Sequence, residues 1–182
     1  MAPRHLIAPL LLAALAAAPL AQAQSAGNAS LVAPKQLIVD PSLPKGTARA
    51  NVLAARRYDT FWNNGDEALA KAALSPQFVD RTPPPGRVQG PDGPLQASKA
   101  FRQAVPDLTC EVEQMLVVGD RVVSHLHFAG HFTGNFNGMQ GKGQAIDFIA
   151  TDIYRVAEGK IVENWHLEDN LTLLKQLGAI KD

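Results

Sequence analysis

Two hydrophobic periodicities divide the chain into a helical N-terminal part and a C-terminal part in which apolar and polar residues alternate. The apolar face of the first predicted helix consists of Val52, Ala55, Tyr58, Phe61 and Trp62. Asn64-Gly65 ends this helix, and Asp66 caps a second one over residues 67–74. Pro91–Pro94 opens a third helix, and Pro106 ends it. The pattern therefore predicts three N-terminal helices.

The period changes to two at Leu108, which is typical of half-buried strands. The predicted strands span residues 108–118, 121–136, 144–156 and 160–167, after a short extended piece at 78–80. Gly119-Asp120 forms a tight turn, and a proline-rich loop over residues 82–90 excludes helix and central strand. Asp169 then caps a short closing helix that ends at Gly178. Helices followed by antiparallel strands predict an α+β fold.

The first 23 residues predict a secretory signal peptide. Arg4 supplies the positive charge, residues 6–20 are almost wholly apolar, and Ala21-Gln22-Ala23 is a small-x-small cleavage signal. A membrane anchor is the alternative, but the apolar run of about 15 residues is shorter than the roughly 20 that a bilayer requires. We therefore expect an exported protein, periplasmic or secreted, that has no membrane contact after cleavage of residues 1–23.

The residues after the signal peptide predict a leader and one domain. Residues 24–46 are rich in Pro, Ala and Ser, so we expect a flexible leader. Its apolar island, residues 37–39, is the one candidate within it for contact with the domain surface. Residues 47–182 then form a single domain of ordinary length.

Charge, cysteine content and missing motifs exclude several classes of partner, cross-link and active site. The chain has 17 basic and 17 acidic residues, and its zero formal net charge argues against nucleic acid and anionic membranes as partners. The single cysteine, Cys110, excludes an intramolecular disulfide, and its place in an alternating strand predicts a buried thiol. The sequence contains no GxSxG nucleophile motif, no phosphate-binding glycine loop and no HExxH zinc motif.

Three histidines have the spacing of a possible metal site. His125, His127 and His131 have the same parity, so they share one face of a strand. The opposite face carries apolar residues and suits the interior of the domain. The histidines are therefore expected outside, in solvent or at a subunit contact, and we predict no metal and no cofactor.

The segments FWNNGD, VVGDRVVSHLHFAGHFTGNFNG, DIYR, GKIVENW and LLKQLG are arranged as in a known family. Over residues 50–178 the chain resembles the SnoaL-like polyketide cyclases, or ester cyclases, of the nuclear transport factor 2-like superfamily. The resemblance implies a cone-shaped, strongly curved antiparallel sheet wrapped around the three N-terminal helices, with a deep pocket inside. It also implies an intramolecular aldol condensation without metal or cofactor, in which a carboxylate is the general acid and base. Such sheets commonly pair through their outer face, so we expect a homodimer.

Asp169 follows the WHLE segment at the expected mouth of the cone. By its place in the family pattern it is the first candidate for the catalytic acid and base. An aldol step needs a base for the proton next to a carbonyl and an acid for the developing alkoxide, and a partly desolvated carboxylate can serve both. The alternative is structural, because aspartate is a preferred N-cap and a helix starts here.

Asp152 and Tyr154 are two residues apart, so they share a strand face with Phe148 and other apolar residues. That face is expected to line the pocket, which makes Phe148 a candidate for substrate contact and Asp152 and Tyr154 candidates for catalysis. An acid within an apolar face must be hydrogen-bonded or functional. The structural alternatives are a carboxylate paired with a backbone group or an arginine, and a core tyrosine whose hydroxyl is satisfied.

Trp165 is predicted on the pocket wall. It shares a strand face with Ile161 and Leu167, and it is either a stacking surface for a flat ligand or a core aromatic. His166 then points the other way, to solvent or to a subunit contact.

Asp80, Trp62 and Phe132 complete the predicted pocket. Asp80 ends a short strand at the proline-rich loop and is either a polar group of the rim or part of a surface pair with Arg81. Trp62 lies on the first helix and is a core or pocket aromatic. Many relatives carry a GTH-type segment where this chain has Gly130–Gly134, so the histidine moves by one residue and Phe132 takes the inward position.

Three functions fit these residues. The first is a cofactor-independent enzyme that carries out an aldol-type cyclisation or isomerisation on a hydrophobic carbonyl compound. The second is an exported protein that binds an apolar small molecule without turnover, and the third is a purely structural dimer module. An enclosed carboxyl with an elevated pKa favours the enzyme, whereas polar groups that are few and do not converge favour the binding protein.

Overall fold

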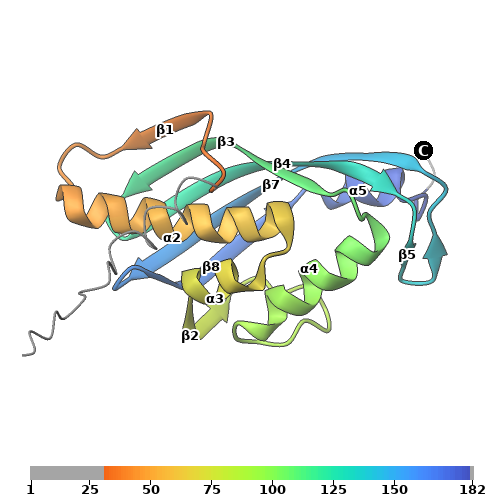
Figure 1. The fold of residues 1–182 in the computed structure, drawn as a ribbon, viewed down its shortest axis with the longest axis horizontal. Coiled ribbons are helices and arrows are strands. Elements are labelled where there is room, and N and C mark those ends of the chain that lie inside the picture. The colour runs from red at the N-terminus through yellow and green to blue at the C-terminus, as the bar shows by residue number, and fades with distance from the viewer. Residues whose placement is uncertain (1–30, 181–182) are drawn as a thin grey trace, which may run out of the picture. The chain divides into compact units, whose positions relative to one another are not determined.

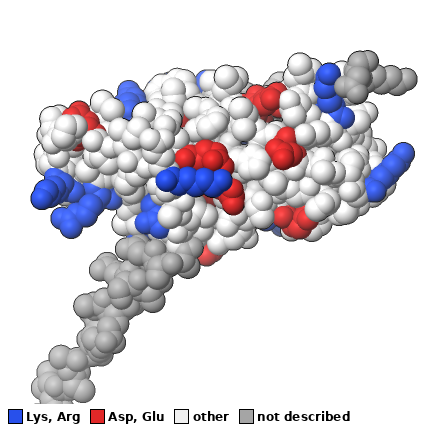
Figure 2. All heavy atoms as spheres, turned by 90° about the horizontal axis from the view of Figure 1, so that it is seen from above, with Lys and Arg blue, Asp and Glu red and all other residues white. Residues whose placement is uncertain are grey.

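A computed structural model describes residues 31–180 (Figure 1). The predicted signal peptide, residues 1–23, and the first part of the predicted leader lie outside the described residues. Within residues 31–180, no helix is both long enough and apolar enough to cross a membrane. The face shown in Figure 2 carries basic and acidic side chains in small separate groups, in keeping with the zero net charge.

Three helices precede the long strands, as the helical spacing predicts. They are α2 (Lys45–Asn64), α3 (Glu67–Ala73) and α4 (Asp92–Ala104), and Figure 1 shows them gathered on one face of the sheet. Gly65 ends α2 with a φ of 77°, a left-handed conformation that glycine adopts without steric cost, and its N–H donates to the Phe61 carbonyl at 2.7 Å. The carboxyl of Asp66 accepts from the Ala68 N–H and caps α3.

A six-stranded sheet forms the other layer, with the strand order β1-β3-β4-β7-β8-β2. The strands are β1 (Gln36–Val39), β2 (Leu74–Asp80), β3 (Thr109–Val118), β4 (Arg121–Phe132), β7 (Gln144–Ala157) and β8 (Lys160–Glu168). A separate hairpin joins β5 (Asn135–Phe136) to β6 (Met139–Gln140), and a short helix, α5 (Asn170–Gln176), follows β8. The predicted α+β fold with a short C-terminal helix is confirmed.

The sheet is mixed at its edges, which the strand pattern does not predict. The four central strands β3, β4, β7 and β8 are antiparallel. In contrast, β1 pairs parallel with β3, and β2 pairs parallel with β8. Helices separate each edge strand from its partner along the chain, and a parallel pair needs such a long connection.

The second half of the predicted leader packs on the domain. Its apolar island forms β1, which pairs with β3 over Gln36–Val39. Arg56 of α2 donates through Nε to the Val32 carbonyl and through Nη2 to the Leu31 carbonyl, both at 2.7 Å. The Val32 N–H also donates to Thr60 Oγ1 at 2.9 Å, so the buried Leu31 is fixed against α2.

The side chains of β4 and β7 alternate between the inner and the outer face of the sheet as predicted. Even-numbered side chains point to the helices and are buried, among them Leu126, Phe128, Phe132, Ile146, Phe148, Asp152 and Tyr154. The histidines of β4 point to the other face, where His125 contacts Thr151 at 2.9 Å and His127 contacts Asp147 at 2.8 Å. Cys110 is buried as predicted, and burial raises the pKa of its thiol.

The pairing of β7 with β8 contains an irregularity. Val156 of β7 pairs with Ile161 of β8. One residue earlier on β7, Arg155 pairs with Glu163, so β8 has one extra residue, Val162. Such a bulge turns every following side chain of the strand to the opposite face.

This bulge reverses the predicted orientation of two residues. Asn164 is buried and His166 lines an internal cavity, so both point inward. Trp165 pairs with Ile153 on the outer face, where the Arg121 guanidinium lies 5.6 Å from its ring centre. The prediction that Trp165 forms the pocket wall and His166 points away from it is therefore wrong.

Candidate active site

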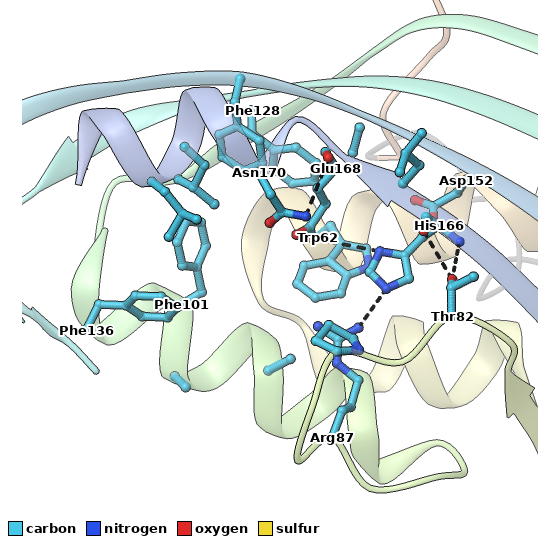
Figure 3. A pocket seen from close by; sticks show the side chains of 18 of the residues that line it. Trp62, Thr82, Arg87, Phe101, Phe128, Phe136, Asp152, His166, Glu168 and Asn170 are labelled. Carbon is cyan, nitrogen blue, oxygen red and sulfur yellow. Dashed lines mark hydrogen bonds and ion pairs between the residues drawn. The ribbon is translucent and has the colours of Figure 1, made fainter. Parts of the chain in front are cut away.

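A cavity of about 720 Å³ lies between the helices and the sheet (Figure 3). Its walls come from α2, α4, β4, β7, β8, α5, the β5–β6 hairpin and the proline-rich loop. Apolar side chains make up most of the lining. This volume suits a small organic molecule, since ligand pockets in proteins typically measure about 300–1,000 Å³.

One side of the cavity is built from aromatic rings (Figure 3). Phe128 of β4 and Phe148 of β7 are direct register partners, and their rings stack at 5.2 Å with an interplanar angle of 12°. Trp62 of α2 meets Phe128 edge to face at 6.4 Å. Phe101 of α4 meets Phe148 in the same way at 6.2 Å. These surfaces favour a flat apolar ligand.

The other side of the cavity is polar, because β7 contributes Asp152 and β8 contributes Asn164 and His166 to its wall (Figure 3). Ser124 of β4, Asp152 of β7 and His166 of β8 are direct register partners. In the next row, Tyr154 of β7 is opposite Asn164 of β8. Register partners have Cβ atoms about 4.5–5.5 Å apart, so the side chains of Asp152 and His166 are neighbours.

Asp152 is a buried carboxyl at the wall of the cavity, with 6% of its surface exposed. Its Oδ1 accepts a hydrogen bond from Asn164 Nδ2 at 2.8 Å. Burial, the largest effect, raises the pKa of Asp152 to about 8, the Asn164 bond opposes this rise, and the charge of Asp59 adds to it. At neutral pH this carboxyl therefore keeps its proton.

His166 belongs to a polar cluster beside Asp152. Its Nε2 lies 3.4 Å from Arg87 Nη1 and 4.0 Å from Asp80 Oδ2, and its Nδ1 lies 3.8 Å from Glu168 Oε1. Arg87 Nη1 also lies 3.5 Å from Asp80 Oδ2. The His166 backbone N–H donates to Thr82 Oγ1 at 2.8 Å, which joins β8 to the proline-rich loop. The imidazole therefore has polar neighbours at both ring nitrogens, Arg87 and Asp80 at Nε2 and Glu168 at Nδ1.

A second buried carboxyl, Asp59 of α2, lies in the core next to this polar row. Its Oδ1 accepts from the Tyr154 hydroxyl at 2.7 Å, and its Oδ2 accepts from the Ser124 hydroxyl at 3.0 Å. Burial raises the pKa of Asp59 to about 7, and the two hydroxyl bonds limit the rise. Tyr154 is fully buried by this arrangement and does not line the cavity.

Comparison with known protein families identifies the family to which this chain belongs. The profile of the SnoaL-like polyketide cyclases matches residues 52–177. The chain belongs to this family. Among curated proteins, no sequence matches the chain significantly.

Solved structures agree with this family membership. A Bacillus cereus protein assigned as a polyketide cyclase is 43% identical, with a TM-score of 0.76 over 84% of this chain and 96% of that chain. IdmH of Streptomyces antibioticus, also assigned as a polyketide cyclase, is 26% identical, with a TM-score of 0.63 over 70% of this chain and 98% of that chain. An LEH-like epoxide hydrolase of M. tuberculosis is 16% identical, with a TM-score of 0.55 over 72% of this chain and 91% of that chain, and shows the shared fold alone.

Asp169, the first candidate for catalysis in this SnoaL-like chain, is a helix cap. Its Oδ1 accepts from the Thr172 N–H at 3.1 Å, and its Oδ2 accepts from the Thr172 hydroxyl at 2.7 Å. These two bonds, the side-chain bond first, lower the pKa of the carboxyl. Asp169 does not line the cavity, so the geometry supports its structural alternative.

Other predicted pocket residues divide between the cavity and the core. Trp62 and Phe148 line the cavity. Phe132 takes the inward position that its parity predicts, but it is fully buried in the core and does not reach the cavity. Asp80 is not paired with Arg81, which binds Glu163 instead, and it lies behind the cavity wall against Arg87 and His166.

Sequence reasoning missed the polar residues that β8 and the proline-rich loop bring to the cavity. On β8 these are Asn164, His166 and Glu168. Their alternation is a signal in itself, because three polar residues at every second position indicate one polar strand face. Arg87 reaches the cavity from an irregular loop, and no local pattern predicts the direction of its side chain.

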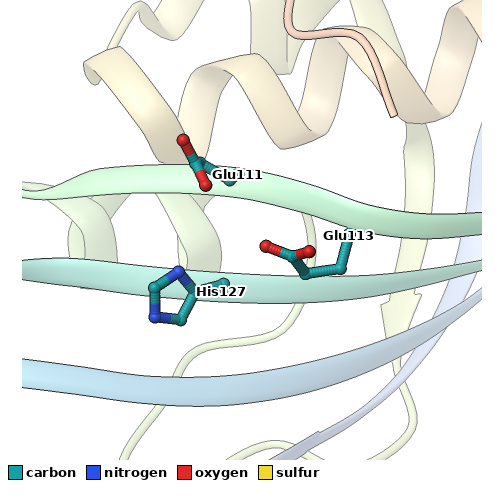
Figure 4. Close-up of side chains that lie close together, drawn as sticks. All are labelled: Glu111, Glu113 and His127. Carbon is teal, nitrogen blue, oxygen red and sulfur yellow. The ribbon is translucent and has the colours of Figure 1, made fainter. Parts of the chain in front are cut away.

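A second polar cluster lies on the outer face, where Glu111 and Glu113 of β3 approach His127 of β4 (Figure 4). Lys35 Nζ lies 2.9 Å from Glu111 Oε2 and 2.6 Å from Glu113 Oε1. The lysine ammonium thus bridges both carboxylates, and His127 contacts Asp147. These pairs account for the cluster as a set of surface contacts.

Proposed function

We propose that this chain is a cofactor-independent enzyme that carries out an aldol-type cyclisation or an isomerisation on a hydrophobic carbonyl compound. The observation that carries the proposal is the enclosed carboxyl of Asp152, whose pKa of about 8 leaves it protonated at neutral pH beside an apolar cavity. A carboxylic acid of this kind can donate its proton to a carbonyl or alkoxide oxygen. Membership of a cyclase family supports the same chemistry.

His166 supplies the second group that the reaction requires. Its ring lines the same cavity, and its strand position is directly opposite Asp152. A neutral imidazole has a nitrogen that can accept a proton, so His166 is the base that removes the proton next to the substrate carbonyl. The enolate carbon then attacks a second carbonyl carbon, a C–C bond forms, and Asp152 protonates the new alkoxide. The proton held by His166 restores Asp152, and the cyclised product is an isomer of the substrate.

A non-catalytic binding protein for an apolar small molecule is the second candidate. It is favoured by the contacts among Asp80, Arg87 and His166, which satisfy one another without a ligand. In that case the aromatic rings supply the affinity, and Asp152 with Asn164 supplies one oriented hydrogen bond to the ligand.

We also propose that the chain is exported and forms a homodimer. The export proposal rests on the signal-like composition of residues 1–23, and it points to compounds met outside the cytoplasm. Cell fractionation with and without this segment tests it. The dimer proposal rests on the outer face of β7, where Ile149 and Ile153 are 44% and 40% exposed.

The proposed acid is tested by turnover in Asp152→Asn. A thermal-shift screen of hydrophobic carbonyl compounds first identifies a ligand of the wild-type protein. Asp152→Asn is expected to keep binding this ligand but to lose turnover by about 100-fold or more, the usual contribution of a general acid. Asp169→Asn is the matched control and keeps both properties, because asparagine also caps helices.

Each outcome of this experiment decides between the candidates. Undiminished turnover in Asp152→Asn contradicts the proposed acid. Binding without any turnover by the wild-type protein favours the binding protein instead.

A further inference from the structure

The proposed mechanism uses Asp152 but leaves the second buried carboxyl, Asp59, without a role. Asp59 has 0% of its surface exposed, and its two hydrogen-bond partners among residues 31–180, Tyr154 and Ser124, are hydroxyl groups rather than cations. A buried carboxyl with neutral partners is costly when it ionises. Such a group, next to a second acid, is a candidate for a functional part of the site.

The two hydroxyls that bind Asp59 also flank Asp152. Ser124 is the direct register partner of Asp152 on β4. Tyr154 follows Asp152 by two residues on the same face of β7, and it donates its single hydroxyl proton to Asp59. Both residues that bind Asp59 are therefore strand neighbours of Asp152, and the charge of Asp59 raises the pKa of Asp152.

The number of hydrogen-bond donors distinguishes the two carboxyls. Asp59 accepts from two hydroxyls, one on each oxygen, at 2.7 and 3.0 Å. Asp152 accepts from the Asn164 amide at 2.8 Å. Donated hydrogen bonds stabilise the ionised form of a carboxyl, so one negative charge shared by the pair settles on Asp59. The proton then stays on Asp152, which faces the cavity.

We infer that Asp59 and Asp152 share one proton as a coupled pair, in which Asp59 is the positioning residue that keeps this proton on Asp152. Its use in catalysis rests on the proposed function, because the proton on Asp152 is the one that the substrate oxygen receives. Two interacting acids of this kind lose their protons in two separate steps that belong to the pair.

The groups around the pair are consistent with this assignment. The titratable or charged groups that face it are Tyr58 of α2, Cys110 of β3, Tyr154 of β7, His166 and Glu168 of β8, and Asp80 and Arg87 of β2 and the following loop. Burial raises the pKa of Tyr58 and of Cys110, so both stay neutral. Arg87 is already in contact with Asp80 and His166.

The inference is tested by following the titration of Asp152 in the ligand-free protein with carboxyl-carbon NMR. Asp59→Asn removes the second charge while keeping size and polarity, so the titration midpoint of Asp152 is expected to fall by about one pH unit. Ser124→Ala removes one of the two donors from Asp59 and is expected to lower the same midpoint by less. Asn164→Ala removes the donor of Asp152 and is expected to raise it.

The Asp152 midpoint decides the outcome. An unchanged or raised midpoint in Asp59→Asn overturns the inference, and if that variant does not fold, the same result in Ser124→Ala overturns it. The proposed function fails separately, through undiminished turnover in Asp152→Asn, and that result leaves the titration of the pair unaffected.

Discussion

At the scale of single residues, Asp152 and Asp169 show how neighbours decide the role of a carboxyl. Asp152 is buried, and burial together with the nearby charge of Asp59 favours its protonated form and raises its pKa to about 8. Asp169 accepts two hydrogen bonds from Thr172 at the start of α5, which favour its ionised form. The first arrangement suits an acid that donates a proton, and the second suits a helix cap.

Asp152→Asn is predicted to make the protein more stable at alkaline pH. The unfolded chain releases the Asp152 proton near its ordinary pKa of 3.8, whereas the folded chain keeps it until about pH 8. Between these values the wild-type protein therefore loses up to about 1.4 kcal/mol of unfolding free energy per pH unit through this group. Asparagine does not ionise, so the melting temperature of the variant should exceed that of the wild type at about pH 8, and the excess should shrink towards pH 4.

Asp169→Asn is the control for this pH series and should show the opposite trend. Hydrogen bonds lower the pKa of Asp169, so its contribution is present above its ordinary pKa and is lost as the solution becomes acidic. A melting-temperature difference for Asp152→Asn that does not grow with pH would contradict its buried, protonated state.

At the scale of elements, the bulge at Val162 of β8 arranges the site. It places Asn164 and His166 inside, next to Asp152, and it places Trp165 outside. The parity of β4 and β7 could be predicted from their alternating residues, but the bulge could not. It arises where two paired strands differ by one residue, and that mismatch exists only after β7 and β8 have paired.

The two tryptophans of the chain provide a direct test of this orientation. Trp62 lines the cavity, and Trp165 lies on the outer face. A ligand found by thermal shift should quench the fluorescence of wild-type protein and of Trp165→Phe, because the cavity tryptophan is present in both. Trp62→Phe should lose this response while still folding. Quenching that survives in Trp62→Phe and disappears in Trp165→Phe would show that the ligand binds on the outer face.

At the scale of the whole described domain, the sheet has one face against the helices and one exposed face. The inner face of β7 is buried, whereas its outer face exposes Ile149 and Ile153, next to Trp165 on β8. Exposed apolar residues grouped on one sheet face are typical of a contact surface. The proposed homodimer would use this face, and the cavity would remain open to ligands.

Ile153→Lys is therefore predicted to convert a dimer into a monomer, because a buried lysine ammonium opposes association. Light scattering coupled to size-exclusion chromatography measures the change. Leu37→Lys is the matched control, since Leu37 is 46% exposed on the edge strand β1 and should leave the dimer intact. A wild-type protein that is monomeric at high concentration would contradict the dimer.

The sequence by itself determined the order of the three N-terminal helices, the four central strands and the closing helix, the family and the inward faces of β4 and β7, because periodicity and motifs are local properties. Only the tertiary structure decided which polar residues meet. Asp59 of α2 has no distinguishing sequence pattern, yet it lies against Tyr154 and Ser124 from two distant strands. The pKa of a carboxyl depends on neighbours far away in sequence, so the choice of Asp152 over Asp169 required the folded chain.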